Sequence, residues 1–324
     1  HAFAIYRTSD SDFSDNEHNR EMVNRNKQAK LRLAALTLLL VIATEVEKRL
    51  IFGYWHCLFA TDESCQPISL GNSVFRDSSP RCRILSLQTI IQLLRNSKPF
   101  LIQAENKDKV PSTFTPFSVT LGNMIAFTYD KLTQALIKEG DLTVLAQILK
   151  CISIFITVTP FHRLRSGIVS GFVKYVRLLV RHKDPTVKVA ALIVIKNLIS
   201  LPEMTSEILE IVEIPKSKIE FDWRKIDESL RMAQTREEDE LIDLEFDDEE
   251  EDLLDEPNVE EAVSINAKKM PWVLQNILEN LGIHKGVLKL PSIAMSVRIE
   301  SLQVLAAMAT HYLLLKDHLL PIAT

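Results

Sequence analysis

Four residues close together in the sequence could in principle hold a metal ion: His56, Cys57, Cys65 and Cys82. Structural zinc sites usually draw their ligands from cysteine pairs that are two to four residues apart. No pair here has that spacing, because Cys57 and Cys65 are too far apart and Cys82 is farther still. We therefore predict no metal site and assign these side chains to the hydrophobic core.

A nucleophilic catalytic centre is not predicted either. Ser166 and Ser170 lie near His162 and Arg163, but no acidic residue completes a catalytic triad. The sequence also lacks a G-x-S-x-G elbow, a Walker loop and an H-E-x-x-H motif. Closely spaced carboxylates occur in one acidic run, which lacks the fixed geometry that acid–base catalysis needs. The sequence thus predicts a protein that is not an enzyme and needs no cofactor.

Cations that could bind a partner recur along a helix predicted over residues 161–182. They are Arg163, Lys174, Arg177, Arg181 and Lys183. The first four share one face at helical spacing, and the opposite face is apolar. Two interpretations remain open: an ordinary solvated face, or a surface for an acidic partner. Nucleic acid is the less favoured partner, because no aromatic side chains accompany the cations.

The elements expected to position these cations are helices in pairs, with no sheet. Leu and Ile dominate the apolar residues, and glycine is scarce, at 8 of 324 residues, which disfavours doubly wound α/β folds. Proline and glycine separate the periodic segments. The predicted helices are 21–50, 67–76, 80–95, 115–138, 141–158, 161–182, 185–200, 203–213, 219–235, 271–281 and 292–315.

A recurring helix face indicates a repeat. Four windows align on a basic residue that we call the anchor: Arg32, Arg83, Lys188 and Arg298. A small residue follows each anchor at the third position and a leucine at the fourth. These leucines are Leu36, Leu87, Leu192 and Leu302. Because the positions share one helix face, we expect the leucines to be buried and the anchor to lie at the edge of that face. Asp184 is predicted to cap the helix that carries Lys188.

An acidic insert interrupts the pattern. Residues 236–261 contain 16 Asp or Glu and one Arg, a charge of −15. The whole chain carries −5, so the remainder carries +10. Such a run repels itself, and we predict disorder over 235–268. The helical array would then occupy 21–234 and resume over 269–324, where we expect it to continue past the end of the chain.

The first 20 residues are predicted to be disordered. Ser9 and Ser14 each precede an acidic residue by three positions, a spacing typical of acidophilic kinase sites, so both are candidate phosphorylation sites. The longest apolar run, residues 33–43, is about half the ~20 residues that a membrane span needs. Four cysteines without a disulfide-like spacing favour a reducing compartment, the cytoplasm or the nucleus.

Three aromatic residues follow the first long helix: Phe52, Tyr54 and Trp55. Aromatic side chains bury large areas, so packing on a neighbouring helix is the first interpretation. A peptide-anchoring site is the alternative.

The turn and helix in residues 184–192, Asp-Pro-Thr-Val-Lys-Val-Ala-Ala-Leu, resemble the HEAT repeat. Strings at 9–15, 52–55, 115–119, 175–184 and 297–305 are similar to the HEAT repeat-containing protein 6 family. The resemblance implies an all-α fold, an α-α superhelix of the HEAT and armadillo kind, and a domain of unknown function. We expect a scaffold for protein partners that the sequence does not identify, with an unknown oligomeric state. The alternative is a transport-receptor-like or nucleic-acid-associated superhelix that binds charged cargo.

Overall fold

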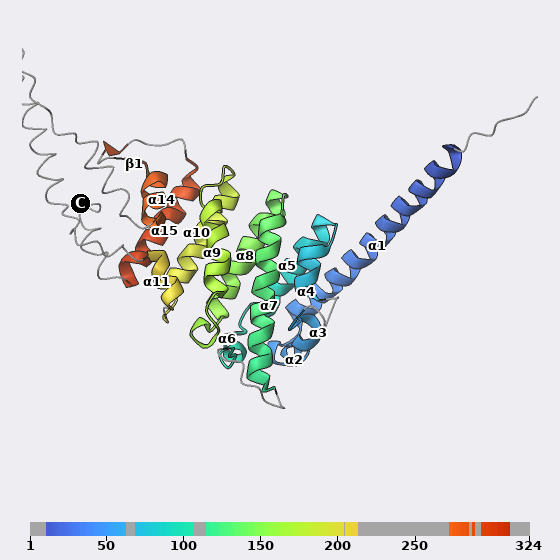
Figure 1. Cartoon of the computed structure of the whole chain (residues 1–324), viewed down its shortest axis with the longest axis horizontal. Helices are drawn as coiled ribbons and strands as arrows, with labels where there is room; N and C mark the ends of the chain where they lie inside the picture. Colours follow the sequence, from blue (N-terminus) through green and yellow to red (C-terminus); the bar gives the residue numbers. More distant parts are fainter. Residues whose placement is uncertain are drawn as a thin grey trace, which may run out of the picture. The chain divides into compact units, whose positions relative to one another are not determined.

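The computed structural model (Figure 1) describes residues 11–62, 69–106, 115–203, 205–212, 272–284, 287–288 and 293–311. The described residues are almost entirely helical. They fall into two compact units, His1–Asn197 and Leu198–Thr324. The helices of the first unit are α1 (Ser11–Glu45), α2 (Lys48–Phe52), α3 (Trp55–Leu58), α4 (Leu70–Arg76), α5 (Pro80–Leu94), α6 (Lys98–Leu101), α7 (Phe117–Lys138), α8 (Leu142–Val158), α9 (Ile168–Leu179) and α10 (Pro185–Ile199), which ends just past the boundary.

The helices of the first unit pack in two rows. In one row α5 lies between α1 and α8, and in the other α7 lies between α4 and α9. The rows are joined because α4 packs on α5 and α7 packs on α8. Asn197 of α10 donates a hydrogen bond to the Ser153 carbonyl of α8 at 2.9 Å, which adds α10 to the first row.

The core between the rows is apolar and tightly packed. The rings of Tyr129 and Phe155 stack with centroids 4.3 Å apart, and Phe172 stacks on Tyr129 at 5.5 Å. The Tyr129 hydroxyl lies 3.1 Å from that of Thr159, which satisfies its hydrogen bonding. Burial raises the pKa of Tyr129 well above its ordinary value. This cluster joins α7, α8 and α9.

Local sequence sets where several helices begin. The Ser69 hydroxyl accepts a hydrogen bond from the Asn72 amide at the start of α4, and Asp141 caps α8 by accepting from the Thr143 and Val144 amides. Those backbone donors lower the pKa of Asp141. Pro80 and Pro185 each occupy the first position of a helix, where no amide hydrogen is needed.

Two predicted helices are wrong at their limits. The first helix begins at Ser11 and ends at Glu45, so residues 11–20 are helical and not disordered. The helix predicted over 161–182 is broken: residues 161–163 form a short 3-10 turn, and α9 starts only at Ile168. Gly167, at φ 98°, allows the left-handed backbone before that start.

A close backbone contact at the start of α7 requires a glycine. Residues 104–106 cross the helix, where the Glu105 amide donates to the Ser118 carbonyl at 3.1 Å. A Cβ atom on Gly122 would lie 2.3 Å from the Glu105 carbonyl oxygen. A side chain at this position therefore forces the two backbone segments apart.

We predict that Gly122→Ala lowers the free energy of unfolding by about 1–3 kcal/mol, the usual cost of overpacking. Gly171→Ala, in α9, is the matched control, because a Cβ there meets no atom within 4 Å. Alanine is the better helix former by about 1 kcal/mol, so this control is expected to stabilise the protein. Urea unfolding measures the free energy of unfolding of both variants. A change of the same sign in the two variants would contradict the prediction.

The described helices of the second unit are α11 (Ser206–Val212), α14 (Trp272–Leu281) and α15 (Met295–His311). α14 packs on both α11 and α15. The predicted absence of any sheet is wrong in one detail, because β1 (Ile283–His284) pairs with β2 (Val287–Leu288) in a two-residue antiparallel ladder. The acidic insert and the helix predicted over 219–235 lie outside the described residues, as do residues 1–10.

The repeat leucines differ in burial. Leu87 and Leu192 are fully buried and Leu36 is half-buried, but Leu302 is 52% exposed, so its predicted burial is wrong. The side of α15 that is covered instead carries Val297, Ser301, Val304 and Met308. Ser301 on that side accepts a hydrogen bond from Asn280 of α14 at 3.2 Å, whereas Leu302 lies outside the covered side.

No helix in the described ranges is both long and apolar enough to cross a membrane.

Candidate partner-binding surface

The predicted stripe of cations is shorter than expected. Arg163 lies in the 3-10 turn before α9, so it does not share a helix face with Lys174 and the cations that follow. Its guanidinium lies 3.3 Å from a Glu105 carboxylate oxygen and donates to the Ile102 carbonyl, also at 3.3 Å. The pKa of Glu105 is lowered, first by a hydrogen bond from Ser118 and then by Arg163. Arg163 thus ties two loops of the first unit together.

The remaining cations do gather on one face of α9, as predicted. Lys174, Arg177 and Arg181 are all exposed and follow one another at steps of three and four residues. The backbone turn continues past the end of α9, because the Arg181 amide donates to the Leu178 carbonyl at 3.2 Å. Lys183, also exposed, follows two residues later, after that turn has ended. We call Lys174, Arg177, Arg181 and Lys183 the basic face.

The buried side of α9 fixes the direction of the basic face. Val169, Phe172, Val173 and Val176 are buried, and the helix packs on α7. Their spacing of three and four residues places them on one side of the helix. The cations consequently point away from the core of the first unit.

An apolar side chain lies among these cations. Leu178 is 69% exposed and lies four residues after Lys174 and three before Arg181, so all three are neighbours on the helix surface. Gly171 lies two turns before Leu178 and has open space where a side chain would project. The surface therefore combines positive charge with one exposed leucine beside a flat stretch of helix. Sequence analysis missed Leu178, although its helical spacing to the cations is visible in the sequence.

The anchors Arg32 and Arg83 form ion pairs between neighbouring helix pairs. Arg32 of α1 binds both carboxylate oxygens of Asp77, at 2.8 and 3.1 Å. Arg83 of α5 binds both oxygens of Glu139, at 2.9 and 3.0 Å. Each acid directly follows the first helix of the next pair, Asp77 after α4 and Glu139 after α7. The hydrogen bond that Arg32 donates to Asp77 raises the pKa of Arg32. Two successive turns are thus fastened by the same type of contact.

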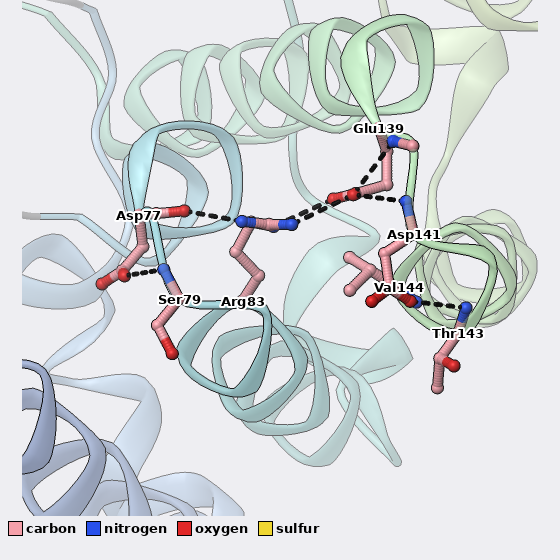
Figure 2. A network of polar contacts seen from close by, with 8 residues as sticks. Asp77, Ser79, Arg83, Glu139, Asp141, Thr143 and Val144 are labelled. Carbon is pink, nitrogen blue, oxygen red and sulfur yellow. Dashed lines mark hydrogen bonds and ion pairs between the residues drawn. The ribbon is translucent and has the colours of Figure 1, made fainter.

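Figure 2 shows that Arg83 lies at the centre of a larger network. Its guanidinium also donates to the Asp77 carbonyl at 2.8 Å, while the Asp77 side chain accepts from the Ser79 amide at 2.9 Å. Glu139 accepts from the Gly140 and Asp141 amides at 3.1 and 2.9 Å. Arg83 therefore holds the turns of two helix pairs in fixed positions.

The later anchors are less regular. Lys188 and Arg298 are half-buried, as expected for the edge of a helix face. Asp184 caps α10, as predicted, by accepting from the Thr186 and Val187 amides at 2.9 and 3.0 Å. The residue directly after α9 is Val180, so the turn before α10 has no acid at the position that Asp77 and Glu139 occupy in the two earlier turns.

Sequence analysis did not find the acidic partners of the anchors. The signal was present, since an Asp or Glu follows the last residue of α4 and of α7. Of the candidate phosphorylation sites, Ser14 falls in α1 and Ser9 lies outside the described residues.

Of the candidate metal ligands, His56 and Cys57 are in contact, with Cys57 Sγ 3.2 Å from His56 Nε2. The part of the chain that the structure describes contains no group of three or more His, Cys, Asp or Glu side chains that could hold a metal ion. Cys57 is exposed, whereas Cys82 and Cys151 are buried free thiols in different helices. Burial raises the pKa of Cys151, which keeps that thiol protonated. Cys65 lies outside the described residues.

Comparison with known protein families identifies a match. The model of a family described as a domain of unknown function, DUF4042, matches residues 30–208, more than half of the 324 residues. The matched range contains the anchors Arg32 and Arg83, the basic face and the capping residue Asp184. No solved structure matches the chain.

Proposed function

We propose, from the premise that this chain belongs to the DUF4042 family, that it is a non-enzymatic scaffold that binds protein partners. The proposal includes its architecture: the two rows of helices in the first unit are HEAT-like pairs, and they stack into a superhelix. The fastening of α1 to the α4–α5 turn, and of α5 to the α7–α8 turn, by equivalent ion pairs supports a repeated unit. Such stacks offer long surfaces for protein partners.

The observation that carries the proposal is the basic face with its exposed leucine. Interfaces gain orientation and association rate from complementary charge, and affinity from desolvated apolar anchors. Lys174, Arg177 and Arg181 supply the charge, and Leu178 supplies an apolar contact. We therefore propose that an acidic segment of a partner protein binds along α9.

Reversing the charge of the basic face tests the proposal. The triple variant Lys174→Glu, Arg177→Glu and Arg181→Glu is expected to weaken partner binding at least tenfold, because attraction becomes repulsion. The measurement is quantitative affinity purification of the full-length protein, with partners identified by mass spectrometry. A soluble, folded variant that keeps every partner at normal occupancy would refute a role for the basic face.

A control with the same change in net charge separates local from global electrostatics. Arg76→Glu, Arg81→Glu and Lys150→Glu alter three exposed cations on other helices of the first unit. This control is expected to change partner binding by less than about threefold, since exposed charges separated by more than ~8 Å are largely screened at physiological salt.

Nucleic acid as charged cargo is the second candidate, and the same cations favour it. It predicts that affinity for duplex DNA or RNA falls steeply with salt and disappears in the triple variant. If the chain instead binds a charged protein cargo as a transport receptor does, affinity purification is expected to recover an acidic protein that binds the basic face. We propose a cytoplasmic or nuclear location, which the free thiols of Cys57, Cys82 and Cys151 support.

A further inference from the structure

A second surface of the first unit carries exposed aromatic rings. Phe52 of α2, Phe100 of α6 and Phe117 of α7 come from three separate helices, and the Phe52 ring contacts the other two. The Phe52 and Phe100 rings stack with centroids 4.9 Å apart, and Phe117 approaches the edge of Phe52 at 6.1 Å. Figure 1 shows α2, α6 and the first turn of α7 together at the lower edge of this unit. We call these three rings the aromatic patch.

Buried aromatic side chains support the aromatic patch on its inner side, and its outer side is partly exposed to solvent. Trp55 is buried and contacts Phe52 with a centroid distance of 5.1 Å, and Phe59 contacts Trp55 at 4.9 Å. Phe117, in contrast, is 54% exposed, and Phe52 and Phe100 are partly exposed. A large aromatic ring held in place by its neighbours while facing water is the usual form of an interaction anchor.

Further apolar side chains on the same short helices and loops are exposed. They are Leu50, Tyr54 and Ile102. Exposed apolar residues that occur singly need no explanation, but several beside a ring cluster mark a binding surface.

Cations are concentrated in the segments that carry two of the three rings. The segments that carry Phe52 and Phe100, residues 48–52 and 95–103, contain four cations and no acid. The cations are Lys48, Arg49, Arg95 and Lys98. Arg49, Arg95 and Lys98 are exposed. The pKa of Lys48 is lowered, first by burial and then by the charge of Arg95, so these two cations lie close together. The acids nearest in sequence are Glu47, which precedes α2, and Glu105, which is engaged by Ser118 and Arg163.

We propose that the aromatic patch is a docking site for a short segment of a partner protein that places an aromatic or long aliphatic anchor against these rings and carries acidic residues beside it. The rings of Phe52, Phe100 and Phe117 contact the anchor, and the cations of residues 48–52 and 95–103 bind the flanking carboxylates. This surface is separate from the basic face, since it is built from α2, α6 and α7. It gives the proposed scaffold a second contact with different chemistry.

Three labelled peptides test the proposal by fluorescence anisotropy on the full chain. The first has one central tryptophan flanked by aspartate and glutamate. The second has serine in place of tryptophan, and the third has lysine in place of the acids. The first is expected to bind at least tenfold more tightly than either of the others, because only it offers both anchor and charge. Equal binding of the first two peptides would overturn the proposal.

Phe117→Ala is the decisive variant, with Ile137→Ala as its control. Both residues lie in α7 and are exposed to the same extent, 54% and 55%, so the two truncations remove side chains of similar exposure. Phe117→Ala is expected to lower the affinity for the first peptide at least tenfold. Ile137→Ala is expected to keep that affinity within twofold of the unchanged chain. Unchanged circular dichroism confirms that both variants are folded.

Two further arms separate this inference from the proposed function. Lys98→Glu is expected to lower the affinity for the first peptide. The triple charge reversal on α9 is expected to leave unchanged the ratio of the affinities for the first and second peptides. If the triple variant makes these two affinities equal, the anchor binds at Leu178 and the aromatic patch is not the site. If Phe117→Ala instead dissociates an oligomer in analytical ultracentrifugation, a second copy of the chain covers the patch and the peptide proposal fails.

Discussion

Replacing Arg83 by methionine is expected to lower the free energy of unfolding by about 3 kcal/mol, because it leaves a buried carboxylate without its cation. The side chains of Arg83 and Glu139 are only 15% and 7% exposed. Methionine fills similar space but can neither neutralise Glu139 nor donate to the Asp77 carbonyl. Urea unfolding followed by circular dichroism measures the loss, with separate transitions fitted for the two units.

Arg81→Met is the matched control for this variant. Arg81 lies two residues earlier in α5 and is exposed, so its replacement is expected to change stability by less than about 0.5 kcal/mol. The double variant Arg83→Met, Glu139→Gln is expected to be more stable than Arg83→Met alone, since glutamine removes the uncompensated charge and can still accept from the Asp141 amide. Equal stability of the arginine variants would mean that the network in Figure 2 contributes nothing to folding.

Leu192→Ala is expected to lower the free energy of unfolding by roughly 2–5 kcal/mol, the range for a leucine truncated inside a packed core. Leu192 is 2% exposed and lies in the middle of α10. Alanine at this position removes apolar contacts and leaves a cavity that the surrounding helices fill only in part. Urea unfolding of the full chain measures the change.

The equivalent position in the last repeat window provides the control. Leu302→Ala is expected to cost less than about 1 kcal/mol, because Leu302 is 52% exposed and little surface is returned to water. Equal costs at Leu192 and Leu302 would mean that the same repeat position is buried in both windows, which contradicts the exposure of the Leu302 side chain.

The sequence alone predicted most of the longer helices and the residues that start several of them, but not the short helices α3 and α6. Apolar side chains at steps of three and four residues, with Pro80 and Pro185 at first positions and Asp184 as a cap, are local signals that need no knowledge of the fold. For this reason α4, α5, α7, α8, α10 and α14 lie close to their predicted limits. The anchor positions of Arg32 and Arg83 were likewise visible in the repeat.

Only the tertiary structure decided what each helix face contacts. Periodicity says that one face is apolar, but burial depends on the neighbours that cover it, so Leu192 is enclosed while Leu302 faces water. The partners of Arg32 and Arg83 are 45 and 56 residues away in the sequence, a separation at which no local rule applies. The aromatic patch has the same origin, because Phe52, Phe100 and Phe117 become neighbours only when α2, α6 and α7 pack together.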